Sequence, residues 1–134
     1  MTILKSESIP IMVEEDVVRA RQLTRKWAVD LGFKIVDQTK FVTAVSELAR
    51  NTLIYGKGGF MLLEGLEKNL RKGLRVTFED RGPGIPDIAK AMENGFTTGH
   101  GLGLGLGGAK RLSNEFEILS KPGQGTRITI ARWN

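Results

Sequence analysis

Residues 99–108 read GHGLGLGLGG, and residues 109–112 (AKRL) continue with helix-forming residues. Six glycines in ten residues allow a ligand to come close to backbone NH groups, and a following helix turns its positive end toward that ligand. The stretch therefore predicts a phosphate-binding loop. Leu102, Leu104 and Leu106 alternate with the glycines, which indicates a packed loop rather than a flexible low-complexity segment.

This loop differs from the common phosphate-binding signatures. No Gly-Lys-Ser/Thr follows it, so it is not a Walker loop. Residues 103–108 fit G-x-G-x-x-G, but the preceding strand and the later acidic residue of a dinucleotide site are missing. His100 could contact phosphate, yet a single histidine among glycines is more often merely exposed, and we assign it no catalytic role.

A second motif follows an expected strand, where residues 79–85 read EDRGPGI. Asp80 leaves the strand into a rigid turn in which Gly82 and Gly84 allow a flat ligand to approach closely. Such a carboxylate could accept a hydrogen bond from the exocyclic amine of adenine, a bond worth about 1.5–3 kcal/mol. The same residues alone would also suit an ordinary turn with an Asx hydrogen bond.

A third motif lies on a helix expected to begin with Asp37 as its N-cap and to end near residues 55–56. Glu47 and Asn51 are four residues apart and share a face that is separate from the core-facing stripe of Phe41, Val45, Leu48 and Thr52. Magnesium needs few protein oxygens, so the Asn51 amide could serve as its ligand, with Glu47 placed as a general base. Alone, this pair would also fit a solvated helix face.

The remaining periodicity predicts the rest of the fold. We expect a strand over 9–13, a helix over 14–31, strands over 59–66 and 74–79 joined by the polar segment 67–73, and strands over 115–120 and 126–133. Two or three helices would then cover one sheet of four or five strands. This is an α+β two-layer sandwich, formed by a single domain over residues 1–134.

The composition is that of an ordinary globular protein, with 40% apolar and 26% charged residues. The absence of cysteine excludes disulfides and thiolate metal sites, so any metal must use oxygen ligands. No signal peptide or membrane span is visible, and we expect a cytoplasmic protein. The net charge of +5 suits a nucleotide, an acidic protein or nucleic acid; nucleic acid is the weaker alternative because the basic residues are dispersed.

Taken in order, E-x-x-x-N, D-x-G-x-G and G-x-G-x-G resemble the N, G1 and G2 boxes of the GHKL ATPases, the group of gyrase, Hsp90, histidine kinases and MutL. The resemblance implies a Bergerat-type sandwich, a mixed sheet covered on one face by helices, with ATP and Mg²⁺ as cofactors. By this resemblance Asn51 binds magnesium, Glu47 is the base, and Asp80 and Thr126 hold adenine. The other implied ATP contacts are Gly82, Gly84, Gly99, Gly101, Leu102, Gly103, Gly105 and Leu106.

Within that family the chain is similar to the serine/threonine kinases of the anti-sigma-factor group. The likeness implies transfer of the ATP γ-phosphate to STAS-domain proteins of a bacterial stressosome, and a PP2C-type phosphatase activated by docking. The alternative is a non-catalytic, ATP-dependent switch that acts by docking. These kinases can place a lid arginine on the γ-phosphate, but residues 85–109 contain none. Lys90, His100 and Lys110 are the candidate replacements.

Overall fold

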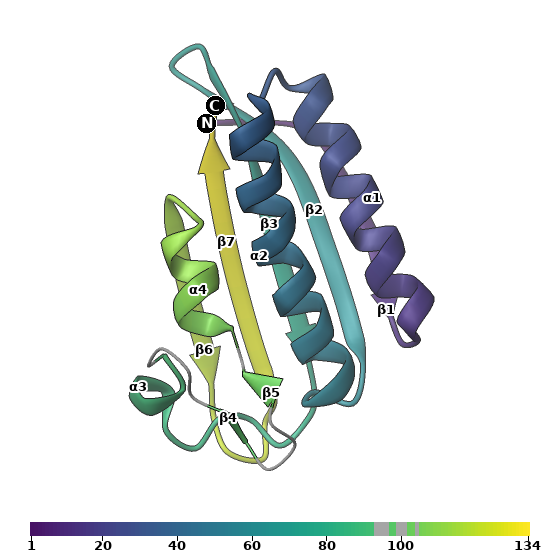
Figure 1. Cartoon of the computed structure of the whole chain (residues 1–134), viewed down its shortest axis with the longest axis vertical. Helices are drawn as coiled ribbons and strands as arrows, with labels where there is room; N and C mark the ends of the chain where they lie inside the picture. The colour runs from purple at the N-terminus through teal and green to yellow at the C-terminus, as the bar shows by residue number, and fades with distance from the viewer. Residues whose placement is uncertain (93–96, 99–101, 104) are drawn as a thin grey trace.

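The computed structural model describes residues 1–92, 97–98, 102–103 and 105–134 (Figure 1). The elements follow the order β1 (Thr2–Ile11), α1 (Glu14–Asp30), α2 (Ile35–Ile54), β2 (Gly59–Lys68), β3 (Arg71–Asp80), α3 (Ile88–Ala91), β4 (Thr97–Thr98), β5 (Leu102–Gly103), α4 (Leu106–Arg111), β6 (Glu115–Ser120) and β7 (Thr126–Trp133). None of the helices in the described ranges is long and apolar enough to cross a membrane.

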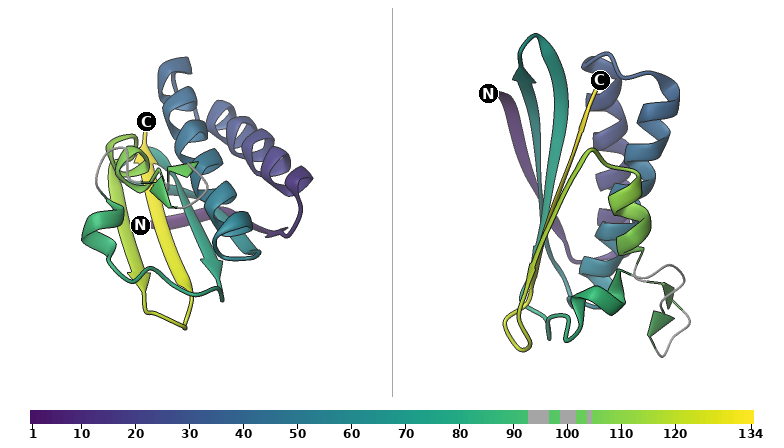
Figure 2. Two further views of the ribbon diagram at one scale, coloured as in Figure 1. Left: turned by 60° about the horizontal axis from the view of Figure 1, so that its bottom comes forward. Right: turned by 90° about the vertical axis from the view of Figure 1, so that its left-hand side faces the viewer.

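The architecture is the predicted two-layer sandwich. Five strands form one sheet in the order β1-β2-β3-β7-β6, and α1, α2 and α4 lie on one of its faces (Figures 1 and 2). Every pairing in this sheet is antiparallel, so the expectation of a mixed sheet is wrong. The reason is that α1 and α2 run in opposite directions over the sheet and return the chain to the end where β1 stopped, so that β2 runs back along β1.

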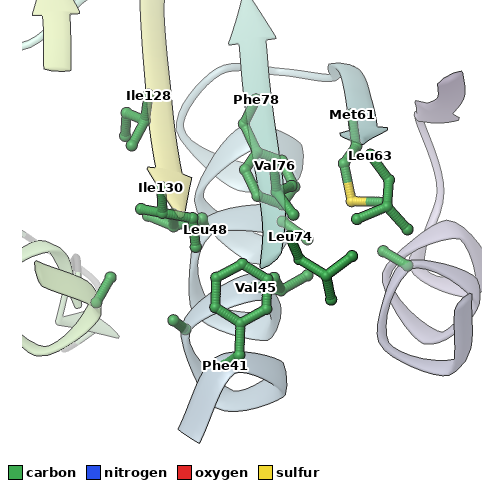
Figure 3. Close-up of a cluster of buried hydrophobic side chains, with 14 of the residues drawn as sticks. Phe41, Val45, Leu48, Met61, Leu63, Leu74, Val76, Phe78, Ile128 and Ile130 are labelled. Carbon is green, nitrogen blue, oxygen red and sulfur yellow. The ribbon is translucent and has the colours of Figure 1, made fainter. Parts of the chain in front are cut away.

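The core lies between α2 and the middle of the sheet. The predicted α2 stripe is buried and packs toward side chains of β3 and β7, among them Val76, Phe78 and Ile130 (Figure 3). Helix α2 begins at Ile35, however, with Lys34 rather than Asp37 at the N-cap position. Asp37 lies in the first turn and accepts a hydrogen bond from Arg132 Nη2 at 2.7 Å, which lowers the pKa of its carboxyl group.

Two strands extend further than their sequence patterns indicate. Strand β1 spans Thr2–Ile11 instead of residues 9–13, because it pairs with β2 along its whole length although most of its side chains are exposed. Strands β2 and β3 continue through the polar segment expected to connect them and meet at a two-residue turn, Asn69–Leu70. Backbone pairing, rather than apolar alternation, determines both extensions.

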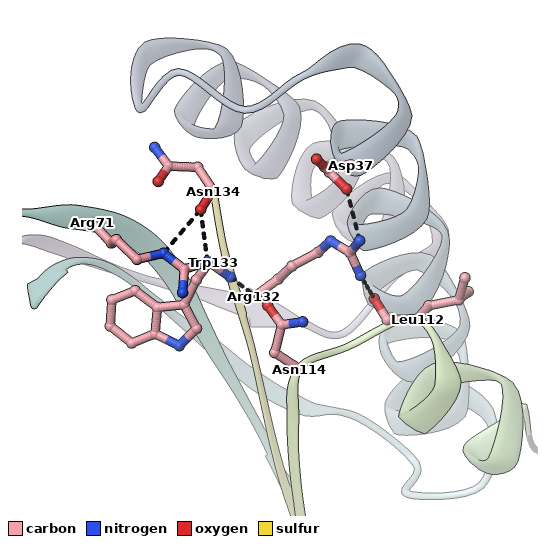
Figure 4. A network of polar contacts seen from close by, with 7 residues as sticks. All are labelled: Asp37, Arg71, Leu112, Asn114, Arg132, Trp133 and Asn134. Carbon is pink, nitrogen blue, oxygen red and sulfur yellow. Dashed lines mark hydrogen bonds and ion pairs between the residues drawn. The ribbon is translucent and has the colours of Figure 1, made fainter.

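A polar network attaches α4 to the sheet at the end where β7 finishes (Figure 4). The Arg132 guanidinium bridges two helices: Nη1 donates to the Leu112 carbonyl at 2.8 Å, and Nη2 donates to Asp37. Asn114 accepts a hydrogen bond from the Trp133 NH at 2.7 Å. These contacts fix the C-terminal end of α4, and its first residue, Leu106, is buried against the core.

Candidate functional site

A pocket of about 330 Å³ lies where β3 ends and β7 begins. It is lined by predicted residues from all three motifs: Asn51 of α2, Asp80 at the end of β3 with Gly84 in the turn after it, and Leu106 of α4. Thr126, the first residue of β7, also lines it. The motifs are far apart in the sequence, and the fold brings them to one cavity.

The Asp80 carboxylate is held at the pocket wall by the backbone. Its Oδ1 accepts a hydrogen bond from the Gly82 NH at 2.9 Å, and the backbone NH of Thr126 also hydrogen-bonds to this side chain. The β3–β7 register pairs Asp80 directly with Thr126. Burial raises the pKa of Asp80, an effect that these two hydrogen bonds oppose. The result is a half-buried, oriented acceptor.

Three glycines from different segments surround Asp80 so closely that none of them could carry a side chain without displacement. A Cβ on Gly56 would lie 2.5 Å from Asp80 Oδ2, and a Cβ on Gly82 would lie 2.8 Å from the Gly56 Cα. A Cβ on Gly125 would collide with the Asp80 carbonyl. Sequence reasoning missed Gly56, because a glycine shortly after a helix normally indicates only helix termination.

Ser120 joins the Gly-Pro-Gly turn to the β6–β7 turn. Its hydroxyl accepts a hydrogen bond from the Ile85 NH at 2.8 Å and lies 2.9 Å from Thr126 Oγ1 and 3.1 Å from the Gly125 carbonyl oxygen. Gly84 adopts a φ of +76° and packs against the backbone of Lys121. No sequence signal separates Ser120 from other strand-terminal serines, so this support of the pocket wall was also missed.

Glu47 and Asn51 occupy adjacent turns of α2 in different surroundings. Asn51 is half-buried and lines the pocket, whereas Glu47 is exposed and stands outside the lining. A Cβ on Gly105 would lie 2.7 Å from Glu47 Oε2, so the Glu47 side chain rests against the backbone that begins α4. Glu47 is therefore a residue of the rim, one helical turn from Asn51.

The glycine-rich loop is described in part. Gly105 is the N-cap of α4 with a φ of +66°, and Leu106 is 2% exposed and lines the pocket, which confirms packing for this leucine. Leu102 and Gly103 form β5, which pairs with β4. Gly99, His100, Gly101 and Leu104 lie outside the described residues. The phosphate-binding loop as a whole remains a prediction.

Two carboxylates, those of Asp80 and Asp87, line the pocket together with one lysine in the described part of the chain. Within the part of the chain that the structure describes, Lys90 of α3 is the one cation in the lining, whereas Lys110 is exposed on α4. The described ranges contain no group of three histidine, cysteine or acidic side chains placed to hold a metal ion. A cation held by the Asn51 amide oxygen would take its remaining ligands mainly from the bound molecule and water.

Comparison with known proteins supports the family resemblance that these three motifs indicate. Residues 36–133 match the family model described as histidine kinase-, DNA gyrase B-, and HSP90-like ATPase. The chain is 50% identical over 125 residues to the serine/threonine-protein kinase RsbT of Bacillus subtilis (strain 168), an alignment that covers 93% of this chain and 94% of RsbT. It is 33% identical over 122 residues to the anti-sigma F factor of Thermoanaerobacter sp. (strain X514), covering 85% and 82% of the two chains.

Two solved structures share the fold. The structure of the RsbU and RsbW domains of Rv1364c from Mycobacterium tuberculosis superposes with a TM-score of 0.62 at 20% identity, covering 94% of this chain and 32% of that longer one. The catalytic domain of the histidine kinase ThkA superposes with a TM-score of 0.56 at 18% identity, covering 94% and 95% of the chains. At these identities the likeness concerns the fold alone.

Proposed function

The chain belongs to the histidine kinase-, DNA gyrase B- and HSP90-like ATPase family, and from that premise we propose that it is a serine/threonine-protein kinase that uses ATP. The observation that carries the proposal is the joint placement of Asn51, Asp80, Leu106 and Thr126 around one pocket. The likeness to RsbT supports the kinase activity. The likeness to anti-sigma F factors supports a role in partner switching.

Adenine occupies the end of the pocket at Asp80. The carboxylate accepts a hydrogen bond from the exocyclic amine, while the backbone of Thr126 and Gly82 keeps the acceptor in place. Ile85 and Ile128 line the same pocket and offer apolar surface to the faces of the base. The volume of about 330 Å³ lies at the lower end of the range for small-molecule sites.

The phosphates extend toward Asn51 and the start of α4, where Gly105 offers a backbone NH group. The single amide oxygen of Asn51 fits a magnesium ion that ATP brings with it, because phosphate oxygens and water supply the remaining ligands. When bound, Mg²⁺ would neutralise charge on the phosphate oxygens. Lys90, the cation of the described lining, would contact the phosphates in place of a lid arginine.

Glu47 accepts the proton in the transfer step. The oxygen of a serine or threonine on the substrate attacks the γ-phosphorus, the bond from phosphorus to the β–γ bridging oxygen breaks, and ADP leaves. The hydroxyl proton passes to the Glu47 carboxylate, which is exposed at the rim where a protein substrate can reach it. Positioning and charge neutralisation provide most of the rate enhancement in such reactions.

The substrates that we propose are STAS-domain scaffold proteins of a stressosome-type stress response, and the second partner is a PP2C-type phosphatase activated by docking. A competing function is a non-catalytic switch that binds ATP and acts by docking alone, which the anti-sigma F factor relatives favour. The two functions differ in whether phosphate reaches a partner.

The deciding experiment is incubation of the purified chain with γ-labelled ATP, magnesium and the STAS-domain proteins of the same organism. Label on a serine or threonine of a STAS protein is the expected result. ATP-dependent binding without labelled product would instead favour the docking switch. Polyanion binding that depends strongly on salt and is unchanged by Asn51→Ala would indicate a nucleic-acid-binding protein.

Asp80→Asn is expected to lower ATP affinity by about ten- to hundred-fold, the value of one hydrogen bond to a charged acceptor. The Gly82 NH would retain the amide oxygen at the Oδ1 position, so the amide NH₂ would face the adenine amine, donor against donor. Isothermal calorimetry measures the change. If the folded variant binds ATP with unaltered affinity, Asp80 does not contact adenine.

The raised pKa of Asp80 also has consequences for pH dependence. The pKa of the Asp80 carboxyl is higher in the folded state than in the unfolded state. Above the unfolded-state pKa, the carboxylate is therefore ionised more easily in the unfolded chain, and this lowers the free energy of unfolding. Asp80→Asn should therefore leave Tm equal or higher at neutral pH. ATP affinity of the unsubstituted chain should fall on acidification at a higher pH than an ordinary aspartate would require.

Gly56→Ala is expected to reduce ATP affinity by about tenfold or more, because a displacement of the Asp80 carboxylate loses part of its charge-assisted hydrogen bond. Gly65→Ala is the matched control, since its added Cβ would lie 3.4 Å from the nearest atom, an ordinary contact. Calorimetry on both variants, with circular dichroism to confirm folding, tests the expectation. Equal affinities for the two variants would contradict the role given to Gly56.

A further inference from the structure

The turn between β2 and β3 places a leucine, Leu70, at a position that leucine does not favour. Asn69 and Leu70 have φ values of +52° and +68°, the left-handed region that a two-residue hairpin of this kind requires at both positions. Asn-Gly is the preferred pair, and a leucine in this region is a costly exception. Leu70 is 95% exposed, so no packing against the described residues offsets this strain.

The charges beside this turn also oppose folding. In the β2–β3 register Lys68 stands directly opposite Arg71, and like charges in facing positions destabilise a sheet. Arg71 is nevertheless fixed in place: its Nε and Nη2 donate to the Asn134 carbonyl oxygen at 3.2 and 2.8 Å (Figure 4). Lys72 adds a third exposed cation. The left-handed Leu70 and the facing Lys68–Arg71 pair are thus two independent unfavourable features. Together they place one exposed apolar side chain among three cations.

A hollow of about 260 Å³ adjoins Leu70. It is lined by Lys68, Asn69, Arg71 and Trp133. The Trp133 ring lies against Gly73, where an added Cβ would come within 2.7 Å of it. The turn thus offers both a projecting leucine and a cationic recess with an aromatic wall. We call residues 68–72 together with Trp133 the hairpin tip.

We propose that the hairpin tip is a docking site for an acidic protein surface that contains an apolar depression, on the partner that is bound rather than phosphorylated. The inference rests on the proposed function, because it assigns a location to the phosphatase-type partner named there. The hairpin tip and Asp80 are at opposite ends of β3 (Figure 1), whose ten residues span about 30 Å. A partner at the hairpin tip therefore leaves the pocket open to ATP.

A protein fits these features better than a membrane or nucleic acid does. Leu70 fills one depression on a folded surface, whereas burial of one leucine gives a bilayer little apolar area. A partner carboxylate entering the recess between Lys68 and Arg71 would relieve their mutual repulsion. Aromatic stacking of bases would need an accessible platform, and Trp133 is partly buried with its Nε1 bonded to Glu115 at 2.8 Å.

The test is calorimetric titration of the purified PP2C-type phosphatase into the full chain, using Leu70→Asn and Lys68→Gln. Asparagine tolerates the left-handed region, so Leu70→Asn should keep Tm unchanged or raise it by up to about 5 °C. We expect each variant to weaken phosphatase binding by about tenfold or more, while phosphorylation of the STAS protein changes less than about twofold. Leu119→Asn, at another exposed leucine, and Lys26→Gln are the matched controls and should bind normally.

The inference is overturned if both hairpin-tip variants bind the phosphatase as tightly as the unsubstituted chain, or if the control variants lose affinity equally. It is also overturned if Leu70 is needed instead for binding to phosphatidylserine vesicles or duplex DNA. The proposed kinase function is tested separately, by transfer to the STAS protein. A failed kinase assay alongside Leu70-dependent docking would refute the kinase activity and leave the docking site standing.

Discussion

Asn51→Ala is expected to abolish detectable phosphoryl transfer. Asn51 is the proposed protein ligand for magnesium, and it lines the pocket in which we propose that ATP binds. Metal neutralisation of transferring phosphate oxygens is worth several kcal/mol, so the rate should fall by about a thousandfold or more. Asn51→Asp should fail similarly, because it keeps the shape but places a negative charge beside the triphosphate.

A single-turnover assay with labelled ATP and the STAS substrate measures this loss. Arg50→Ala is the control, since Arg50 lies in the same turn of α2 but pairs with Glu14 across the helices at 2.9 Å. An exposed ion pair contributes about 0–1 kcal/mol, so this change should leave transfer within about fivefold. Near-normal transfer by either Asn51 variant would show that the metal assignment is wrong.

The sequence correctly predicted those parts of the site whose positions follow from helical periodicity. The stripe of Phe41, Val45 and Leu48 is buried as predicted, and the same periodicity leaves Glu47 and Asn51 on another side of α2. Two strands, 115–120 and 126–133, have the predicted bounds, because apolar alternation and a Pro-Gly turn coincide there. Local pattern and tertiary packing agree in these elements.

The supports of Asp80 could not be predicted in this way, because they depend on distances between separate segments. Gly56 follows a helix and Ser120 ends a strand, positions where these residues are common for local reasons. Their roles become visible only when the β3–β7 register places Asp80 opposite Thr126. Asp37 was misassigned for the same reason, because its partner Arg132 lies 95 residues further along the chain.

The full length of the edge strand β1 could not be predicted from the sequence, because it depends on pairing with β2. Strand β1 is an edge strand with polar and apolar residues exposed together, and a register irregularity between Ile3 and Lys5 interrupts any alternation. Lys5 points its ammonium group over the Trp27 ring, 4.3 Å from the centroid, so a charged residue takes part in packing. A search for apolar periodicity cannot find such a strand.

Glu47→Gln is expected to lower the rate of phosphoryl transfer by about a hundred- to ten-thousand-fold, the usual effect of removing a general base. Glutamine keeps the size of the side chain and its contact with the Gly105 backbone, but it cannot take the hydroxyl proton. Glu47 is exposed and outside the pocket lining, so ATP and partner binding should be nearly unchanged. The expected effect is therefore confined to the chemical step.

Single-turnover transfer at saturating ATP and substrate, together with ATP affinity from calorimetry, separates binding from chemistry. Glu15→Gln, at an exposed glutamate in the first turn of α1, controls for the loss of one surface charge and should transfer phosphate normally. A loss of ATP affinity without a loss of rate at saturation would make Glu47 a binding residue. Full rate at normal affinity would mean that the proton leaves by another route, with solvent or a carboxylate of the partner as the acceptor.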